Sequence, residues 1–70
     1  MAEVKKYLYR RHELYVAPVM NIGYRTMRKP IGDEQGVVLS LSELPVRRTK
    51  TRAQKDLDEW AAARGLEEVA

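Results

Sequence analysis

Few residues in this chain are of the types that build an enzyme site. His12 is the only histidine and cysteine is absent, so no Cys–His pair and no cluster of His and Cys metal ligands can form. His12 is expected to be an ordinary surface imidazole. Asp56 and Asp58 are close in sequence, but a helix would point them about 200° apart. The glycines match neither the phosphate-loop nor the dinucleotide pattern. We therefore expect no enzyme activity, no metal, no cofactor and no small-molecule substrate.

The basic segment at residues 47–52 is the most informative polar feature. It stands directly before the predicted C-terminal helix, where positive charge opposes the helix dipole, so helix stability does not explain it. Free N–H groups at a helix N-terminus, flanked by Arg, Lys and Thr side chains, are suited to an anion or a phosphate. The candidate phosphate-binding residues are Arg47, Arg48, Lys50 and Arg52.

An alternative interpretation treats the same segment as a solvated linker. Arg52 would then pair with Asp56, and Lys55 with Glu59, because residues four positions apart are neighbours on a helix. Three cations stay unassigned in this alternative, namely Arg47, Arg48 and Lys50.

A second, weaker indication comes from the tyrosines, all four of which lie within the first 24 residues. Tyr7 and Tyr9 would share one face of a strand, and aromatic residues among cations on a sheet can stack on single-stranded bases. The alternative is structural, because tyrosine is common in strands and pairs well across them. The additional basic or stacking candidates are Lys5, Lys6, Tyr7, Tyr9, Arg10, Arg11, Arg25 and Arg28.

A C-terminal amphipathic helix, roughly Arg52–Arg64, is the clearest element that could position these residues. Thr51 with Gln54 three positions later predicts a capping box. Gly65 predicts the left-handed stop. The apolar stripe consists of Ala53, Leu57, Trp60 and Ala61. Trp60 is expected to be its main anchor, because an indole buries a large area.

Two strands are predicted in the middle of the chain. Residues 37–42 alternate, with Val37, Leu39 and Leu41 on one face, which is typical of a half-buried strand. Residues 30–36 form a Gly, Pro and Asp turn cluster. Residues 23–28 read as a second strand that is exposed or at an edge, so the two predict a hairpin.

The first part of the chain is ambiguous between strand and helix over residues 4–19. Tyrosine and valine favour one or two strands there, and Pro18 predicts that Glu13–Val19 is an edge strand or ends early. The fold class expected is therefore α+β, with a small antiparallel sheet of three or four strands packed against one C-terminal helix.

Length and composition bound the remaining questions. A chain of 70 residues is expected to form one domain, 1–70, with a small core. The absence of cysteine favours a reducing compartment, and the first residues lack the apolar core of a signal peptide. No apolar run approaches the roughly 20 residues needed to span a bilayer. We therefore expect a cytoplasmic protein that is not associated with a membrane.

Two functional hypotheses follow from this composition. The net charge of +3 is unevenly spread, and two basic blocks that met in space would suit a nucleic acid. The first hypothesis is therefore a small non-enzymatic nucleic-acid-binding or accessory domain. The second is a protein-interaction module or homodimer that pairs through an exposed strand edge. The partner would accordingly be a nucleic acid, another protein or a second copy of the chain.

Overall fold

A computed structural model describes residues 5–32 and 36–69 of the chain. The elements in order are β1 Lys6–Tyr9, β2 His12–Val19, β3 Gly23–Pro30, β4 Leu39–Ser40, α1 Lys50–Arg64 and β5 Glu67–Val69. All strand pairs are antiparallel, and the sheet order is β4-β3-β2-β1-β5. The predicted α+β fold is confirmed, with five strands instead of three or four. The unforeseen strand, β5, is three residues long and mostly glutamate, so it carries no alternating apolar pattern.

Helix α1 begins two residues before the predicted start. Its N-cap is Thr49, whose Oγ1 accepts a hydrogen bond from the Arg52 N–H at 3.3 Å. The predicted capping box is therefore wrong, because Gln54 is buried and its Nε2 donates to the Lys5 carbonyl at 3.1 Å. The predicted stop is confirmed, since Gly65 has φ +63° and ends the helix in the left-handed conformation.

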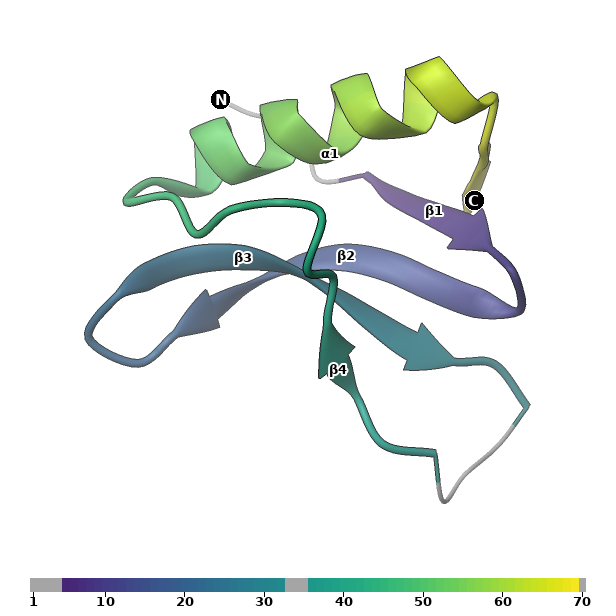
Figure 1. Cartoon of the computed structure of the whole chain (residues 1–70), viewed down its shortest axis with the longest axis horizontal. Helices are drawn as coiled ribbons and strands as arrows, with labels where there is room; N and C mark the ends of the chain where they lie inside the picture. Colours follow the sequence, from purple (N-terminus) through teal and green to yellow (C-terminus); the bar gives the residue numbers. More distant parts are fainter. Residues whose placement is uncertain (1–4, 33–35, 70) are drawn as a thin grey trace.

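Strands β2 and β3 form the long central hairpin of the sheet (Figure 1). The expectation that the Pro18 strand lies at an edge is wrong, because β2 is flanked by β1 and β3. The N–H and C=O of Tyr24 both bond to Arg47, so Tyr24 and Pro18 are a pair without mutual hydrogen bonds. The missing N–H of Pro18 consequently faces the β1 side, beyond the described pairing of β1 with residues 12–14.

The third and fourth strands pair as predicted but over a shorter length. Strand β3 is internal, not an edge, although β4 covers only Met27 and Arg28 of it. The predicted half-buried strand at 37–42 shrinks to Leu39–Ser40, and Val37 and Leu39 are 69% and 48% exposed. The alternation fails at Val37 and Leu39 because α1 packs over β1, β2 and β3 and not over the β4 edge. Part of the acidic tip, residues 33–35, lies outside the described residues.

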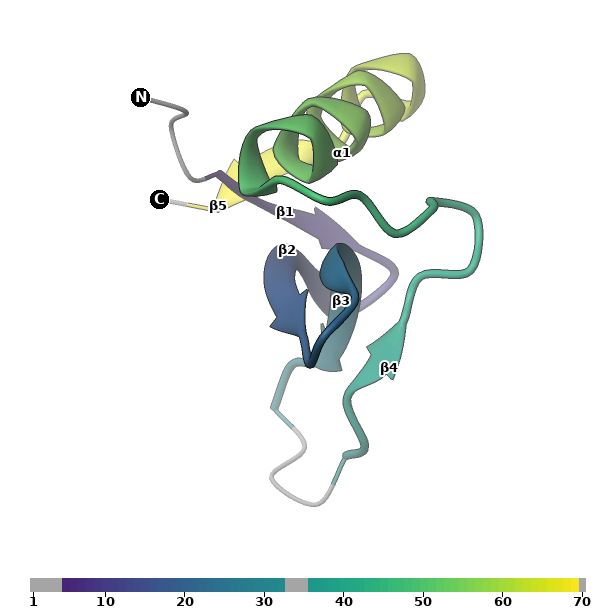
Figure 2. The same cartoon turned by 90° about the vertical axis from the view of Figure 1, so that its left-hand side faces the viewer.

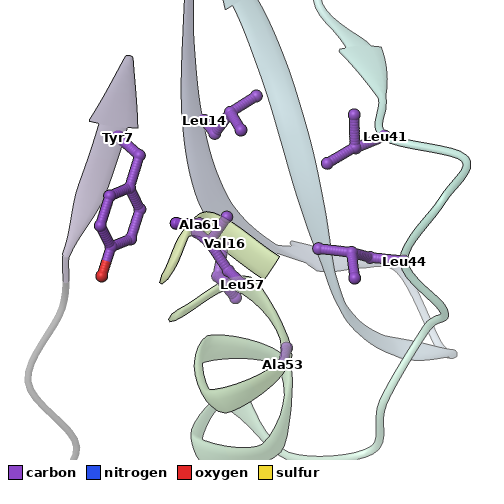
Figure 3. Packing of buried hydrophobic residues seen from close by; sticks show 8 residues of the cluster. All are labelled: Tyr7, Leu14, Val16, Leu41, Leu44, Ala53, Leu57 and Ala61. Carbon is purple, nitrogen blue, oxygen red and sulfur yellow. The ribbon is translucent and has the colours of Figure 1, made fainter. Parts of the chain in front are cut away.

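The core lies between the sheet and α1 (Figure 3). Leu14 and Val16 of β2 meet Leu57 of α1, and Leu41 and Leu44 close the side next to β3. Leu14 and Leu57 are fully buried.

Trp60, the expected main anchor of the helix, is only half-buried. Its indole packs edge-on against Tyr9, with ring centroids 5.0 Å apart. The stripe prediction is confirmed, because Ala53, Leu57 and Ala61 are buried and Trp60, although only partly buried, packs against the same core. The small alanines bring the helix close to the sheet, and Leu57 supplies the buried volume.

The sheet has one covered and one uncovered face. Figure 2 shows α1 over one side, and no helix or strand of the described residues lies over the other. Residues directly opposite each other in paired strands share a face, so Tyr7 and Leu14 lie on the covered side. The uncovered side carries Lys6, Leu8, Glu13, Tyr15, Ala17, Arg25, Met27 and Lys29.

Candidate functional site

Arg47 fixes the basic segment to both the sheet and the helix. Its backbone forms an isolated antiparallel bridge with Tyr24, through Tyr24 N to Arg47 O at 2.6 Å and Arg47 N to Tyr24 O at 2.8 Å. Its Nε donates to Oδ2 of Asp56 at 2.6 Å. The hydrogen bond with Asp56, and then the charge of that carboxylate, raise the pKa of the Arg47 guanidinium. Arg47 is thus a structural cation that positions its neighbours.

This pairing overturns the expected helical ion pair between Arg52 and Asp56. Asp56 is taken by Arg47, nine positions earlier in the chain. Among the described residues, no salt bridge or side-chain hydrogen bond engages Arg48, Lys50, Arg52 or Lys55. The alternative interpretation therefore loses the partners that it assigned to Arg52 and Lys55.

Two shallow depressions meet at Arg47 and Arg52. The larger, about 490 Å³, is lined by Val46, Arg47, Arg48, Thr49 and Arg52, and no acidic residue borders it. The smaller, about 280 Å³, is lined by Arg47, Arg52, Lys55, Asp56 and Glu59. The first has the composition of an anion site, whereas the second contains two carboxylates that would repel an anion.

The start of α1 adds its own positive potential to the larger depression. The first turn contains no acidic residue, although acids are the residues that a helix dipole favours there. Thr49 satisfies the N–H groups of Arg52 and Ala53 through Oγ1 and the carbonyl oxygen. The N–H groups of Lys50 and Thr51 have no acceptor within the helix. The site therefore combines exposed cationic side chains with backbone N–H donors at the start of the helix.

The predicted stacking tyrosines lie elsewhere. Tyr7 is 9% exposed on the helix-covered face, and its hydroxyl donates to Oδ1 of Asp58 at 2.8 Å. Tyr9 packs against Trp60. Their positions give no support to stacking on a nucleic acid. Tyr15, on the uncovered face, lies under the Lys6 ammonium at 5.9 Å from the ring centroid.

The remaining basic candidates are spread over the molecule. The carbonyl of Lys5 accepts from Gln54, and Lys6 pairs with Glu13 at 3.3 Å. Arg25 lies on the uncovered face, one residue from the Tyr24–Arg47 bridge, and Arg28 lies on the covered side opposite Leu14. The Nε atoms of both arginines are buried without a hydrogen-bond partner among the described residues.

Arg10 and Arg11 form the two-residue turn between β1 and β2, at the opposite end of β2 from the turn that joins β2 to β3. Both have positive φ, +47° and +65°, the conformation of a type I′ turn, which favours Asn and Gly. The Arg10 guanidinium lies 5.2 Å from the Tyr9 ring, and that of Arg64 lies 3.9 Å from the Trp60 ring. The structure thus brings Arg47, Arg48 and Arg52 together around the larger depression. Lys50 is the first residue of α1 but does not line that depression, and Arg10 and Arg11 lie apart.

Sequence reasoning missed two kinds of residue at this end of the molecule. Val46 lines the larger depression beside Thr49, a threonine of the segment that the sequence already placed around the anion, and Met20 and Ile22 stand exposed on the neighbouring hairpin turn. The only available signal was Asn21, a residue that tolerates positive φ, between two apolar neighbours.

Within residues 5–32 and 36–69, no group of three His, Cys, Asp or Glu side chains is arranged to hold a metal ion. No helix in the same ranges is both long and apolar enough to cross a membrane.

No known protein family, curated protein or solved structure matches this chain.

Proposed function

We propose that this protein binds nucleic acid through phosphate contacts at the start of α1. The observation that carries the proposal is the acid-free depression lined by Arg47, Arg48 and Arg52 with the N-cap Thr49. Arg48, Lys50 and Arg52 would contact phosphate directly, and Arg47 would hold the segment in place through Asp56. Arginine and lysine contacts of this kind position a protein on the backbone without reading sequence.

The charges at the site favour a polyanion over a small acidic ligand. The depression is shallow and open, and its cations come from two parts of the chain, Arg47 and Arg48 of the linker and Arg52 of the first helical turn. Such an arrangement can follow a line of phosphates but cannot enclose a small molecule, which usually needs a concave, largely apolar pocket. Arg25, beside the Tyr24–Arg47 bridge, would extend the contact onto the uncovered face.

The test replaces the three unpaired cations together, as Arg48→Gln, Lys50→Gln and Arg52→Gln. Each phosphate contact contributes a slope of about 0.9 in log Kd against log salt on duplex DNA, so the variant should bind more weakly and lose up to about 2.7 of slope. Fluorescence anisotropy with labelled single- and double-stranded oligonucleotides gives both quantities.

A matched control removes the same charge from the other end of the protein, as Arg10→Gln, Arg11→Gln and Arg64→Gln. Arg10 and Arg64 lie over the rings of the Tyr9–Trp60 pair, so melting curves must first show that the control folds. If both variants lose the same affinity for the oligonucleotides, the effect depends on net charge and not on the position of the cations. An absence of wild-type binding at low salt would refute the proposal.

A second candidate function is pairing with another protein or a second copy through the β4 edge. Val37, Val38 and Leu39 are exposed beside this two-residue edge strand, whereas the opposite edge, β5, presents Glu67 and Glu68. Charged residues protect an edge and apolar ones leave it open to strand addition. Sedimentation velocity over a range of concentrations tests this candidate, with Val37→Lys and Leu39→Lys expected to abolish any association.

A further inference from the structure

The turn between β2 and β3 presents two large apolar side chains to solvent. Met20 is 85% exposed and Ile22 is 62% exposed. Hairpin turns are usually built from Gly, Asn, Asp, Pro and Ser, and here only Asn21 between them is of this kind, with φ +59°. Neither side chain contributes to the core, so folding does not explain their apolar character.

Backbone hydrogen bonds close the turn and fix the strands on both sides of it. The N–H of Ile22 donates to the Val19 carbonyl at 3.1 Å, and β2 and β3 pair continuously from Val19–Gly23 to His12–Pro30. The strand that leaves the turn is fixed again at Tyr24, by its two backbone bonds to Arg47. Met20 and Ile22 therefore stand on a preformed projection.

The same contacts place this projection beside the unpaired cations. The backbone passes so close at Gly23 that a Cβ there would overlap the Arg47 carbonyl and lie 3.2 Å from the Arg48 Cα. Gly23 directly follows Ile22, so the apolar turn lies next to the backbone of Arg47 and Arg48, which line the acid-free depression. Figure 2 looks toward this end, where the turn lies below the start of α1.

We propose that Met20 and Ile22 form an apolar wedge that enters a base-pair step of duplex DNA while the neighbouring cations hold the phosphates. Met and Ile are among the side chains that partly unstack a step and kink the duplex from the minor groove. The inference rests on the proposed function, because the cations of the α1 start supply the backbone contacts that hold the wedge in place.

The size of the projection favours this partner over two others. A stable protein interface buries about 1,200–2,000 Å², which two side chains on a narrow turn cannot supply. A myristoyl chain alone gives only marginal membrane binding, and Met with Ile is smaller than such a chain. A base step needs only one or two inserted side chains. The adjacent Arg48 and Arg52 match the charge of the flanking phosphates.

The experiment compares wild type with Met20→Ser plus Ile22→Ser. Both positions are exposed, so the variant should keep its melting temperature. Short duplexes with 2-aminopurine at successive positions report unstacking by increased fluorescence, and end-labelled duplexes report bending by energy transfer. We expect wild type to raise the fluorescence and bend the duplex. The variant should do neither and should bind about tenfold more weakly, with an unchanged salt slope.

A matched control carries Leu8→Ser plus Ile31→Ser, two exposed apolar residues at the opposite end of the β2–β3 hairpin from its turn and outside the β4 edge. The control should unstack and bend DNA as wild type does. Salt-dependent wild-type binding without unstacking or bending would overturn the wedge and leave the proposed function standing. No binding to DNA at low salt would remove both. Sedimentation with anionic phosphatidylserine vesicles that depends on Met20 and Ile22, without DNA unstacking, would overturn the wedge in favour of a membrane.

Discussion

Arg47 and Asp56 form a two-point ion pair that joins the basic segment to the second turn of α1. The guanidinium Nε and Nη2 lie 2.6 and 3.5 Å from the two carboxylate oxygens. The side chain of Arg47 is 42% exposed and that of Asp56 only 18%, so the pair lies at the boundary of the core. Because Asp56 is paired with Arg47, it does not pair with Arg52, which forms no salt bridge with the described residues.

Replacing Asp56 with Asn should separate the structural and electrostatic roles of this pair. The melting temperature should fall, because the linker loses an anchor, and affinity for DNA should rise, because Arg47 is released and a negative charge is removed. If Arg47 then contacts a phosphate, the salt slope should increase by about 0.9. Glu59→Gln, which removes an acid that is not in a salt bridge with described residues, is the control for charge alone. Unchanged affinity in Asp56→Asn would show that Arg47 lies beyond reach of the ligand.

The pair also predicts how stability depends on alkaline pH. Asp56 raises the pKa of Arg47 in the folded state. The contribution of Arg47 is therefore complete below its ordinary pKa and is lost only as the pH rises through the raised value. From neutrality to about pH 9, far below the guanidinium range, Arg47→Gln should lower the melting temperature by the same amount at every pH. A difference that shrinks across this range would contradict the assignment.

Leu57→Ala should be among the most damaging substitutions in α1. Leu57 has no exposed surface, and removal of a buried leucine costs about 2–5 kcal/mol. Trp60→Ala should cost less than Leu57→Ala, because Trp60 is half-buried and packs on Tyr9 and Arg64 at the surface. Urea denaturation measures both. The exposed Ala62→Ser gives the baseline of about 0.5 kcal/mol for a surface helix position. A larger loss of stability for Trp60→Ala than for Leu57→Ala would show that the Trp60 indole is the main anchor of the helix.

Two glycines with positive φ offer a paired test of the close approach at the hairpin. Gly32 has φ +78° and open space around a Cβ, whereas Gly23 has φ +148° and a Cβ there would overlap the Arg47 carbonyl. Gly32→Ala should therefore cost about 1–2 kcal/mol of conformational strain, and Gly23→Ala about 3 kcal/mol or more. Equal losses in denaturant melts would show that the linker can move away from the sheet.

The Arg10–Arg11 turn should be improved by ordinary turn chemistry. Both residues have positive φ, and Arg10→Asn with Arg11→Gly removes that strain at the cost of the Arg10–Tyr9 contact. The net gain should be about 1 kcal/mol, which raises the melting temperature of a chain of this size by about 4–8 °C. A lower melting temperature would mean that the arginine contacts outweigh the strain.

The sequence predicted the parts of this fold that depend on local pattern and missed those set by tertiary contact. Gly65 ends the helix as expected, because a C-terminal glycine acts within one turn. Thr51 and Gln54 match the capping-box pattern, but the Gln54 side chain donates a hydrogen bond to the Lys5 carbonyl, 49 positions away in the chain. The alternation of Val37 and Leu39 predicted a strand over residues 37–42, but only Leu39–Ser40 pairs with β3, and a local pattern cannot show whether another element covers that face.

The candidate site divides in the same way. The basic segment was visible in the sequence because it opposes the helix dipole. The sequence could not predict that these cations are unpaired, because the i,i+4 rule assigns Asp56 to Arg52. The Tyr24 bridge brings Arg47 within reach of Asp56 instead. The adjacency of Met20 and Ile22 to Arg48 follows from the same bridge, so no local reading of residues 19–23 could have found it.

The pairing of β5 with β1 has a consequence for the order in which the chain folds. Leu8 and Glu67 lie opposite each other although about 60 positions separate them, whereas the β2–β3 hairpin closes over a three-residue turn. Closing a long loop costs more entropy and slows folding. During synthesis, β5 is also made after every other strand. We therefore expect the central hairpin to form first. The backbone groups along the outer side of β1 should stay unpaired until the helix has docked and β5 has been added to the sheet.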